Sequence, residues 1–266
     1  MKIGKTSNLF AALQPQSDDR IIPYIDKWLV TSPHAGIYEV DDRPYQTRNP
    51  DRTTMNFHPS SDCMKCERLM YFERDVNTEL PDEQIDARLQ AIFKMGSSTH
   101  AMVQAWFAAM SGLTGFPQLV ENEMRIEGGC FEGYGVGGYI DSVIRFPGSD
   151  DRICIEIKTS NSSVFNRLSG PKPEHRLQVG CYIAYLESPF GIVLYINKDT
   201  CEMKEYRVEP VDLTNVLMRW SRVRQAIVAG SIEGLQYGCK VGDANDRTYT
   251  RCPAAGICSR GMICNG

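Results

Sequence analysis

Apolar and polar residues follow two different periods along this chain, and these periods predict where helices and strands lie. Helical spacing, with apolar residues three and four positions apart, covers four stretches: 81–93, 97–110, 174–186 and 211–229. Alternation rich in Ile and Val covers five stretches: 119–127, 134–146, 152–158, 190–197 and 203–208. We expect a break near Gly96, between the first two helical stretches. The order of elements predicts a fold of the α/β (α+β) class, with a central mixed β-sheet flanked by helices.

The two ends of the chain lack this periodicity. Residues 1–55 carry scattered apolar residues and several prolines, so we expect an irregular N-terminal extension with room for one short helix. Residues 56–266 then form the main domain. Its last part, 238–266, is rich in Cys, Gly and polar residues, and we expect this tail to need a bound ligand to become ordered.

The composition excludes some classes of function. Among 266 residues, 29 Lys and Arg stand against 33 Asp and Glu, a formal net charge of -4, so any contact with DNA must be local. No run of about 18 apolar residues could span a bilayer, and the N-terminal residues lack the pattern of a secretory leader. We therefore expect a cytoplasmic protein with no membrane partner. In such a protein the 10 cysteines favour metal or cluster ligation over disulfide bonds.

Two neighbouring strands carry the residues most typical of a catalytic site. A glycine-rich stretch, 135–141, ends in Ile-Asp at Asp141, and after a Pro-Gly turn the stretch 153–159 reads Ile-Cys-Ile-Glu-Ile-Lys-Thr. Period two places Glu156 and Lys158 on one face of the second strand, while the isoleucines enter the core. Antiparallel pairing across the turn would bring Asp141 beside them.

Asp141, Glu156 and Lys158 are suited to metal-assisted hydrolysis of a phosphodiester bond. Carboxylate oxygens hold Mg²⁺ or Mn²⁺, which neutralises charge on the phosphate and lowers the pKa of an attacking water. The amine of Lys158 would orient that water or help to deprotonate it, and would offset developing negative charge. Glu-x-Lys is also very common by itself, and the alternative interpretation is an exposed Glu-Lys pair on a strand.

The helix predicted after these strands adds polar groups to the same region. Gln178 and Tyr182 are four residues apart and therefore lie on one face, where an amide and a phenol can bond to a phosphate or to the metal site. His175, one turn ahead of Gln178, either contacts a phosphate or is a surface residue. Upstream, His100 lies on one side of the helix predicted for 97–110, where it is either a ligand or a packed core residue.

Together these elements resemble the RecB-family nucleases of the PD-(D/E)xK superfamily. The shared pattern is Gly-x-x-x-His (here 96–100), a glycine-rich strand ending in Ile-Asp, a Glu-x-Lys strand and a Gln-x-x-x-Tyr helix, in that order. The resemblance covers about residues 56–266 and implies a PD-(D/E)xK core. By that resemblance the metal ligands are His100, Asp141, Glu156 and the backbone carbonyl of Ile157, and the catalytic residues are Asp141, Glu156, Lys158, Gln178 and Tyr182.

Cysteines near both ends of the main domain form a second candidate site. Cys63 and Cys66 have the Cys-x2-Cys spacing of a metal site, and further cysteines lie in the tail: Cys239, Cys252, Cys258 and Cys264. Four thiolates suit a tetrahedral zinc ion or an iron-sulfur cluster. The other cysteines lie in apolar contexts, and we expect buried thiols at Cys130, Cys154, Cys181 and Cys201.

The segment around Cys66 resembles one branch of the nuclease family. Pro59-Ser60 followed by Cys66-x-Arg-x-x-Tyr is similar to AddB-type repair nucleases and CRISPR-adaptation exonucleases. That resemblance implies a 4Fe-4S cluster, with Zn²⁺ as the alternative, held by Cys66, Cys252, Cys258 and Cys264. Family tails often read Cys-x2-Cys before the last cysteine, whereas both gaps here contain five residues, so Cys63 and Cys239 stay alternative ligands.

The resemblance implies a DNA exonuclease that acts on single strands or strand ends, in DNA recombination, repair or phage DNA processing. A structure-specific endonuclease and a non-catalytic DNA-binding or assembly subunit are the alternatives. No helicase motif accompanies the nuclease motifs, so a helicase or recombination partner is an open alternative that the sequence does not indicate. Basic residues either line the DNA path or form a solvated charged face. Arg219 and Arg222, which have helical spacing, are the better candidates for DNA contact. The other candidates are Arg68, Arg74, Lys94, Lys172, Arg176 and Arg224.

Overall fold

The computed structural model describes residues 19–31, 56–81 and 86–258. They belong to two compact units, each assembled from separated parts of the chain. The described residues of the first unit are 19–31, 91–124 and 139–210, and those of the second are 56–81, 86–90, 125–138 and 211–258. The Glu-x-Lys strand lies in the first unit and the described cysteines of the second candidate site lie in the second.

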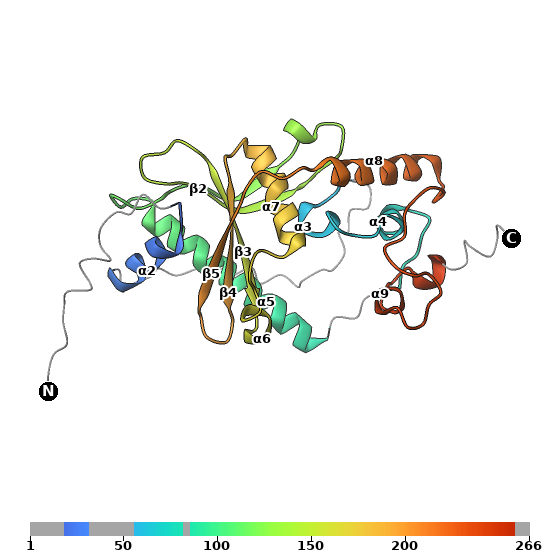
Figure 1. Cartoon of the computed structure of the whole chain (residues 1–266), viewed down its shortest axis with the longest axis horizontal. Coiled ribbons are helices and arrows are strands. Elements are labelled where there is room, and N and C mark those ends of the chain that lie inside the picture. The colour runs from blue at the N-terminus through green and yellow to red at the C-terminus, as the bar shows by residue number, and fades with distance from the viewer. Residues whose placement is uncertain (1–18, 32–55, 82–85, 259–266) are drawn as a thin grey trace. The chain divides into compact units, whose positions relative to one another are not determined.

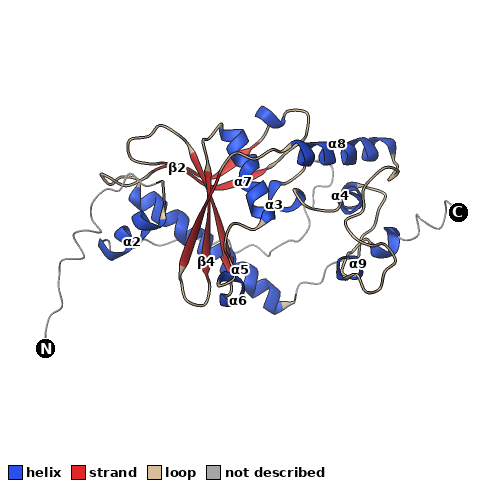
Figure 2. Cartoon of the chain, viewed as in Figure 1, coloured by secondary structure: helices blue, strands red, loops and turns tan. Residues whose placement is uncertain are grey.

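A five-stranded mixed β-sheet forms the centre of the first unit (Figure 2). In spatial order its strands are β1 (Gln118–Ile126), β2 (Gly138–Arg145), β3 (Ile153–Ser160), β4 (Gly191–Asn197) and β5 (Met203–Val208). β3 is antiparallel to β2 and parallel to β4, and β5 is antiparallel to β4. The parallel step requires a crossover, which runs through α6 (Ser162–Phe165) and α7 (Pro173–Leu186).

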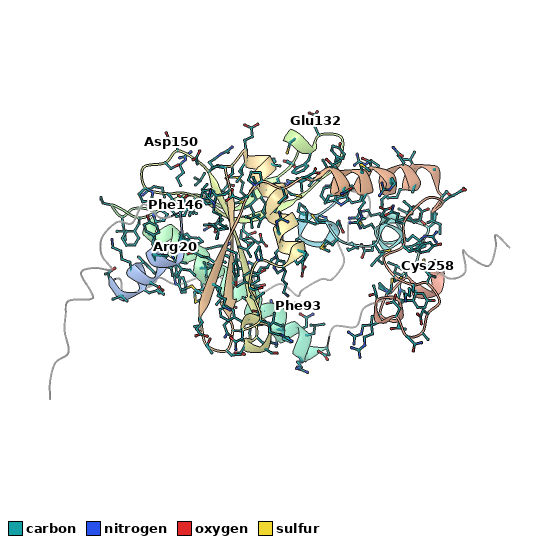
Figure 3. All side chains as sticks on the ribbon, viewed as in Figure 1. Arg20, Phe93, Glu132, Phe146, Asp150 and Cys258 are labelled. Carbon is teal, nitrogen blue, oxygen red and sulfur yellow. The ribbon has the colours of Figure 1, made fainter. Side chains whose placement is uncertain are left out.

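One face of the sheet packs against α2 (Ile22–Thr31) and α5 (Ala87–Met110). The apolar core on this side includes Tyr24, Ile25, Trp28, Val103, Trp106, Phe107, Ile153, Ile155, Ile157, Ile192 and Leu194. The ring of Phe146, which Figure 3 labels, lies with its centroid 5.9 Å from that of Tyr24. The isoleucines of β3 enter the core, as the alternation predicted.

Helix α5 is continuous, so the break expected near Gly96 is wrong. A Cβ atom added at Gly96 would lie 3.8 Å from Oγ1 of Thr159, an ordinary contact, so the glycine marks no turn. The hydroxyls of Ser98 and Thr99 bond back to carbonyls four residues earlier, which keeps these polar residues within the helix. The start predicted after Pro81 falls partly on residues 82–85, which lie outside the described residues.

Helix α7 covers the other face of the sheet and packs against β3 and β4 (Figure 1). Both faces of β3 are therefore buried, and Glu156 is only 2 % exposed. Gly191 permits this packing, because a Cβ atom there would lie 2.5 Å from both Sγ of Cys154 and Cγ1 of Val179. The carboxylate of Glu156 thus lies beneath a helix rather than on an exposed strand.

The second unit is built from helices and loops. Its elements are α3 (Pro59–Asp62), α4 (Glu67–Arg74), the 3₁₀ helix η1 (Gly129–Phe131), α8 (Thr214–Ala229) and α9 (Arg247–Thr250). α4 and α8 lie side by side (Figure 1). The ring of Phe57 stacks on Trp220 at 5.4 Å, and Phe57 also forms an isolated parallel bridge with Val136. That bridge runs along the glycine-rich stretch, and a Cβ atom at Gly137 would lie 3.3 Å from the Asn56 amide.

The predicted fold class, a mixed sheet flanked by helices, is confirmed. All five strands and the helices predicted at 174–186 and 211–229 are present, with shifts of a few residues at their ends. Helix α2 lies within the predicted N-terminal extension, and its apolar side chains belong to the core of the first unit. The domain boundary at residue 55 stays a prediction. No helix among the described residues is long and apolar enough to cross a membrane.

Candidate active site and thiol group

Asp141 and β3 are joined by a hydrogen bond from the backbone to a side chain. The ladder between β2 and β3 pairs Ser142 with Ile155. Next to this pair, the backbone N–H of Ile157 donates to the side-chain Oδ2 of Asp141 at 2.7 Å. The carboxylate thereby replaces a backbone carbonyl as the acceptor. The antiparallel pairing across the turn brings Asp141 beside the Glu-x-Lys strand, as expected.

Glu156 is the most buried carboxylate of this region and has two partners on one oxygen. Its Oε1 accepts from Nζ of Lys158 at 2.5 Å and from Nε2 of Gln178 at 2.8 Å. Its Oε2 is also buried, and no described residue bonds to it. A buried carboxylate oxygen without a partner is costly, so this atom is a candidate ligand for a cation.

Burial and the charge of Asp141 act on Glu156 in the same direction. Burial, and then the negative charge of Asp141, raise the pKa of Glu156 to about 7, although the ammonium of Lys158 opposes this. Burial lowers the pKa of Lys158, but the charge and hydrogen bond of Glu156, together with the charges of Asp141 and Glu174, outweigh it and raise the pKa of the amine. Lys158 is therefore an ammonium ion in this arrangement. Two carboxylates close together leave the site short of positive charge, which a bound cation would supply.

His100 reaches the same carboxylate pair from α5. Its Nδ1 lies 3.4 Å from Oδ1 of Asp141, and its side chain is 28 % exposed. Burial lowers the pKa of His100, but the hydrogen bond and charge of Asp141 and the charge of Glu156 together raise it. The four groups converge in the first unit as two pairs, His100 with Asp141 and Glu156 with Lys158. We call His100, Asp141, Glu156 and Lys158 the carboxylate site.

Gln178 and Tyr182 connect helix α7 to this site. The amide of Gln178 donates to Glu156 and to the hydroxyl of Tyr182, the latter at 2.9 Å. That hydroxyl donates to the backbone carbonyl of Tyr139 on β2 at 3.0 Å. Both side chains lie on one face of the helix, as predicted. The amide nitrogen of Gln178 and the hydroxyl of Tyr182 bond to the protein, while the buried Oε1 of Gln178 has no partner among the described residues. Their observed contacts therefore position Glu156 and brace the two strands.

The donor types of the carboxylate site fit a divalent metal ion, although the donors are bonded to one another. Among the residues that the structure describes, no three His, Cys, Asp or Glu side chains form a ready set of metal ligands. The contacts of Asp141 with His100 and of Glu156 with Lys158 occupy the atoms in question. The free Oε2 of Glu156 and the excess negative charge favour a hard cation. Ile157 is buried on β3, and the ligand role of its carbonyl stays a prediction.

Gln104 and Glu123 also lie beside Asp141, and the sequence patterns did not indicate either as a site residue. The amide of Gln104 donates to the backbone carbonyl of Asp141 at 2.9 Å and to Oε1 of Glu123 at 2.5 Å. Glu123 lies within β1 but has φ of 51°, in the left-handed region. A residue in this conformation interrupts the alternation of side chains along a strand. The alternating sequence pattern therefore could not predict which face Glu123 occupies. The spacing of His100 and Gln104, one helical turn apart, was the available signal.

Four cysteines of the second unit influence one another electrostatically: Cys66, Cys239, Cys252 and Cys258, which we call the thiol group. Within the described residues no three of them form a ready set of metal ligands. Burial, and then the neighbouring thiols Cys66 and Cys252, raise the pKa of Cys239. Burial together with Cys66 and Cys258 does the same to Cys252. Sγ of Cys66 accepts the backbone N–H of Gly238 at 3.2 Å, which holds the Cys239 loop against α4. Figure 3 labels Cys258, whose Sγ accepts a long contact of 3.9 Å from Arg68.

The structure tests some of the cysteine predictions. Cys154 and Cys181 are buried, as expected, but Cys130 and Cys201 are exposed, so that expectation is wrong for them. Cys130 lies in η1 and Cys201 in the tight turn between β4 and β5, where local backbone geometry outweighs the apolar neighbours in sequence. Cys264 lies outside the described residues. Cys63 is buried at the end of α3.

The arginines expected to be the better candidates for DNA contact have partners inside the second unit. Arg219 donates to the backbone carbonyls of Cys63 and Lys65. Arg222 pairs with the buried carboxylate of Glu67 at 2.5 Å. Helical spacing placed the two on one side of α8, but that side faces α4. Their guanidinium groups therefore stabilise the unit.

Comparisons with known proteins give structural likeness only. No protein-family model and no curated protein matches this chain. The solved structure of SSO0001 is similar with a TM-score of 0.46 and 17% identity, over 90% of this chain and 94% of that one. An alkaline exonuclease (LHK-Exo) from Laribacter hongkongensis is similar with a TM-score of 0.48 and 17% identity, over 66% of this chain and 90% of that one. The same values hold for LHK-Exo in complex with dAMP.

Proposed function

We propose that the protein is a metal-dependent deoxyribonuclease of the PD-(D/E)xK type. The observation that carries this proposal is the juxtaposition in the carboxylate site. Glu156 is buried, with one oxygen that has no partner among the described residues and the other bonded to Lys158. The nearby charge of Asp141 disfavours the ionised form of Glu156 unless a positive charge is added. A bound cation would stabilise such a site, and the cation together with Lys158 would bind an anionic substrate such as a phosphodiester.

His100, Asp141, Glu156 and the carbonyl of Ile157 are the groups that would hold Mg²⁺ or Mn²⁺. When bound, the ion would neutralise charge on the phosphate and lower the pKa of the attacking water. Lys158 contributes as an ammonium ion, because its pKa is raised. It therefore orients the water and offsets the charge that develops on the phosphate oxygens, rather than removing a proton from the water.

Gln178 and Tyr182 act as positioning residues in this proposal. Gln178 donates to Oε1 of Glu156, the oxygen that also bonds to Lys158, and Oε2 has no partner among the described residues. The hydroxyl of Tyr182 accepts the second hydrogen bond of the Gln178 amide. A carboxylate in the wrong orientation raises the activation barrier, because a displacement of about 1 Å can reduce rates roughly 100-fold. Variants at these two positions should lower the rate without abolishing DNA binding.

We further propose that the enzyme acts as an exonuclease on DNA strand ends. The test compares linear and circular forms of one single-stranded DNA, with Mg²⁺, with Mn²⁺ and with a chelator. Progressive release of mononucleotides or short oligonucleotides from the linear form, with the circle intact, supports the exonuclease. Cutting of the circle indicates the endonuclease alternative, and no cutting in any condition contradicts the nuclease.

Asp141→Asn separates catalysis from folding in the same assay. The amide can still accept the backbone N–H of Ile157, so β2 and β3 stay joined, but the charge that would bind the cation is lost. We expect the variant to have the wild-type circular dichroism spectrum and no cleavage. A variant that cleaves DNA at the wild-type rate would contradict the proposal.

We propose that the thiol group binds a 4Fe-4S cluster, with Zn²⁺ as the alternative. Burial, and then the proximity of the other thiols, raise the pKa values of Cys239 and Cys252, and a bound metal ion would stabilise the thiolate forms. Cys66, Cys252 and Cys258 are three ligands in this proposal, and either Cys239 or Cys264 is the fourth. Anaerobic purification with a visible spectrum and analysis of iron, sulfide and zinc decides between the two centres.

The fourth ligand is decided by two single variants. Cys239→Ser should lose metal content if Cys239 is the ligand, and Cys264→Ser should lose it if the tail cysteine is. Cys130→Ser is the matched control, because Cys130 is exposed on η1 and is not part of the thiol group. If Cys239→Ser and Cys264→Ser both kept the metal content of the wild type, a four-cysteine site of this composition would be contradicted.

A further inference from the structure

The hydroxyl of Tyr195 lies within hydrogen-bond distance of the imidazole of His175. Tyr195 lies on β4, and its oxygen accepts the backbone N–H of Lys172 at 3.0 Å while lying 2.7 Å from Nδ1 of His175. Burial raises the pKa of Tyr195 to about 12, so the phenol keeps its proton at neutral pH. With its oxygen already accepting from Lys172, the phenol has a proton to donate, and Nδ1 of His175 is the acceptor at hydrogen-bond distance.

A neutral imidazole carries only one N–H. If Nδ1 of His175 accepts the phenol proton of Tyr195, the single N–H of the ring lies on Nε2. Burial, and then the charges of Lys158 and Lys172, lower the pKa of His175 to about 3. The Nε2–H group has no hydrogen-bond partner within the part of the chain that the structure describes, and the side chain is partly exposed. The result is an oriented donor available to an external acceptor.

This donor belongs to the edge of the carboxylate site. His175, Gln178 and Tyr182 form one stripe along α7, at spacings of three and four. The stripe crosses three strands, since the partners are Tyr195 on β4, Glu156 on β3 and the carbonyl of Tyr139 on β2. Tyr195 pairs with Lys158 in the parallel register, so both side chains lie on the same face. His175 is therefore a neighbour of the catalytic ammonium.

The hydrogen-bond acceptor that best fits beside Lys158 and His175 is an anion. The ammonium of Lys158 and a neutral N–H provide two donors of different character on adjacent strands, and neither can accept a hydrogen bond. A DNA strand that places one phosphate at Lys158 carries the next phosphate along its backbone close by. Non-bridging phosphate oxygens are the acceptors that such donors recognise.

We propose that His175 is a substrate-binding residue of the nuclease, whose Nε2–H donates to a non-bridging oxygen of a phosphate neighbouring the one that is cut, and that Tyr195 positions it. The inference rests on the proposed function, because it assigns part of the DNA path of that same site. It also chooses between the two interpretations of His175 that the sequence left open, a phosphate contact and a surface residue.

The hydrogen-bond arrangement is tested without DNA by nitrogen-15 NMR of the histidine side chains. The ring shifts of His175 should be those of the Nε2–H form across neutral pH, and Tyr195→Phe should change them to a mixture of forms. Tyr206→Phe is the matched control, because its hydroxyl bonds only to the carbonyl of Leu168 and its loss should leave the His175 shifts unchanged. A protonated ring, or a proton on Nδ1, overturns the assignment.

The phosphate contact is tested by binding of a fluorescein-labelled single-stranded oligothymidylate in Ca²⁺. Single phosphates are replaced one at a time by methylphosphonate, which removes a charged oxygen. Wild type should lose about 10-fold in affinity at the contacted position beyond the loss at other positions. In His175→Ala that extra loss should vanish, and affinity for unmodified DNA should be lower by about the same factor.

The outcomes separate the two proposals. An extra loss that persists in His175→Ala, or equal losses at every position in both proteins, overturns the phosphate contact. Absence of DNA cleavage together with an intact His175-dependent contact overturns the nuclease and leaves the phosphate contact standing. His175→Gln, which keeps an N–H donor near the same place, should recover part of the affinity if the donor is what matters.

Discussion

The carboxylate site and the thiol group are both recognisable as sequence patterns, but the fold holds them in different ways. Asp141, Glu156 and Lys158 lie on adjacent strands, and hydrogen bonds from Ile157 and Gln178 fix the two carboxylates. The thiol group comes from the start of the short helix α4 and from the segments around α9. Its sulfur atoms make two long contacts, of 3.8 and 3.9 Å, and one hydrogen bond of 3.2 Å. A strand ladder can organise a site before any ligand binds. Loops from distant parts of the chain cannot, so we infer that a metal centre organises the thiol group.

This difference predicts that substitutions in the carboxylate site change chemistry more than folding, whereas those in the thiol group change folding as well. The largest effect is expected for Lys158→Ala. Loss of the ammonium should reduce DNA cleavage by roughly 1000-fold, as for removal of a group that stabilises transition-state charge. Cleavage assays and thermal unfolding of one preparation measure both quantities.

Lys204→Ala is the control for that variant. Lys204 lies on β5, and its ammonium donates only to the backbone carbonyls of Phe165 and Leu168. Its loss should lower the unfolding temperature and leave the cleavage rate of the folded protein within a few-fold of wild type. Equal loss of cleavage in both lysine variants would mean that Lys158 acts through stability rather than chemistry.

Cys66→Ser should have the next largest effect, and on stability rather than on the carboxylate site alone. A structural metal centre contributes folding free energy, so its loss should reduce metal content and bring early unfolding of the second unit. Limited proteolysis with mass spectrometry would show cleavage first within residues 211–258. Cleavage within the strands of the first unit at the same rate would remove the contrast between the two regions.

The pH dependence of the metal-free protein sharpens the same contrast. The folded pKa of Glu156 is raised from 4.5 to about 7, so the folded state binds the proton more tightly than the unfolded state. The resulting stability is present below about pH 4.5 and is lost as the pH rises through about 7, an effect on the order of a few kcal/mol. Denaturant unfolding in a chelator measures it.

Two checks accompany that measurement. Glu156→Gln carries no titrating group, so its stability should vary much less across the same range. Saturating Mg²⁺ or Mn²⁺ should reverse the trend for wild type, because the ion favours the carboxylate. Stability of the metal-free wild type that rises between pH 5 and 7, and does so equally in the variant, would show that Glu156 is not buried as a neutral acid.

The smallest effects are expected from a pair of glycine substitutions, one in each region. Gly191→Ala places a methyl group 2.5 Å from two buried side-chain atoms and should cost about 1–3 kcal/mol of unfolding free energy. Gly238→Ala places a methyl group 2.8 Å from Cβ of Cys66, at an exposed position rather than in a packed core. We expect little loss of stability there and lower metal occupancy. Calorimetry and metal analysis measure the two responses.

The sequence was sufficient for the order of the elements and for the pairing that brings Asp141 to Glu156 and Lys158. Alternation determines the faces of β3, and a short turn after β2 permits only an antiparallel neighbour. The continuity of α5 through Gly96 was not predictable from the glycine alone. The packing of α5 against the sheet, through side chains such as Val103 and Phe107, is a tertiary property that a single glycine does not reveal.

What the sequence by itself determined is which residues share a strand face or a helix face, because those periods are local properties of the backbone. Only the tertiary structure decided that α7 covers Glu156, that Gln104 and Glu123 join Asp141, and that Arg222 pairs with Glu67. It also brought the hydroxyl of Tyr195, 20 residues away in sequence, within 2.7 Å of Nδ1 of His175. Burial, and therefore pKa and hydrogen-bond direction, depends on which elements pack together, and no local period encodes that.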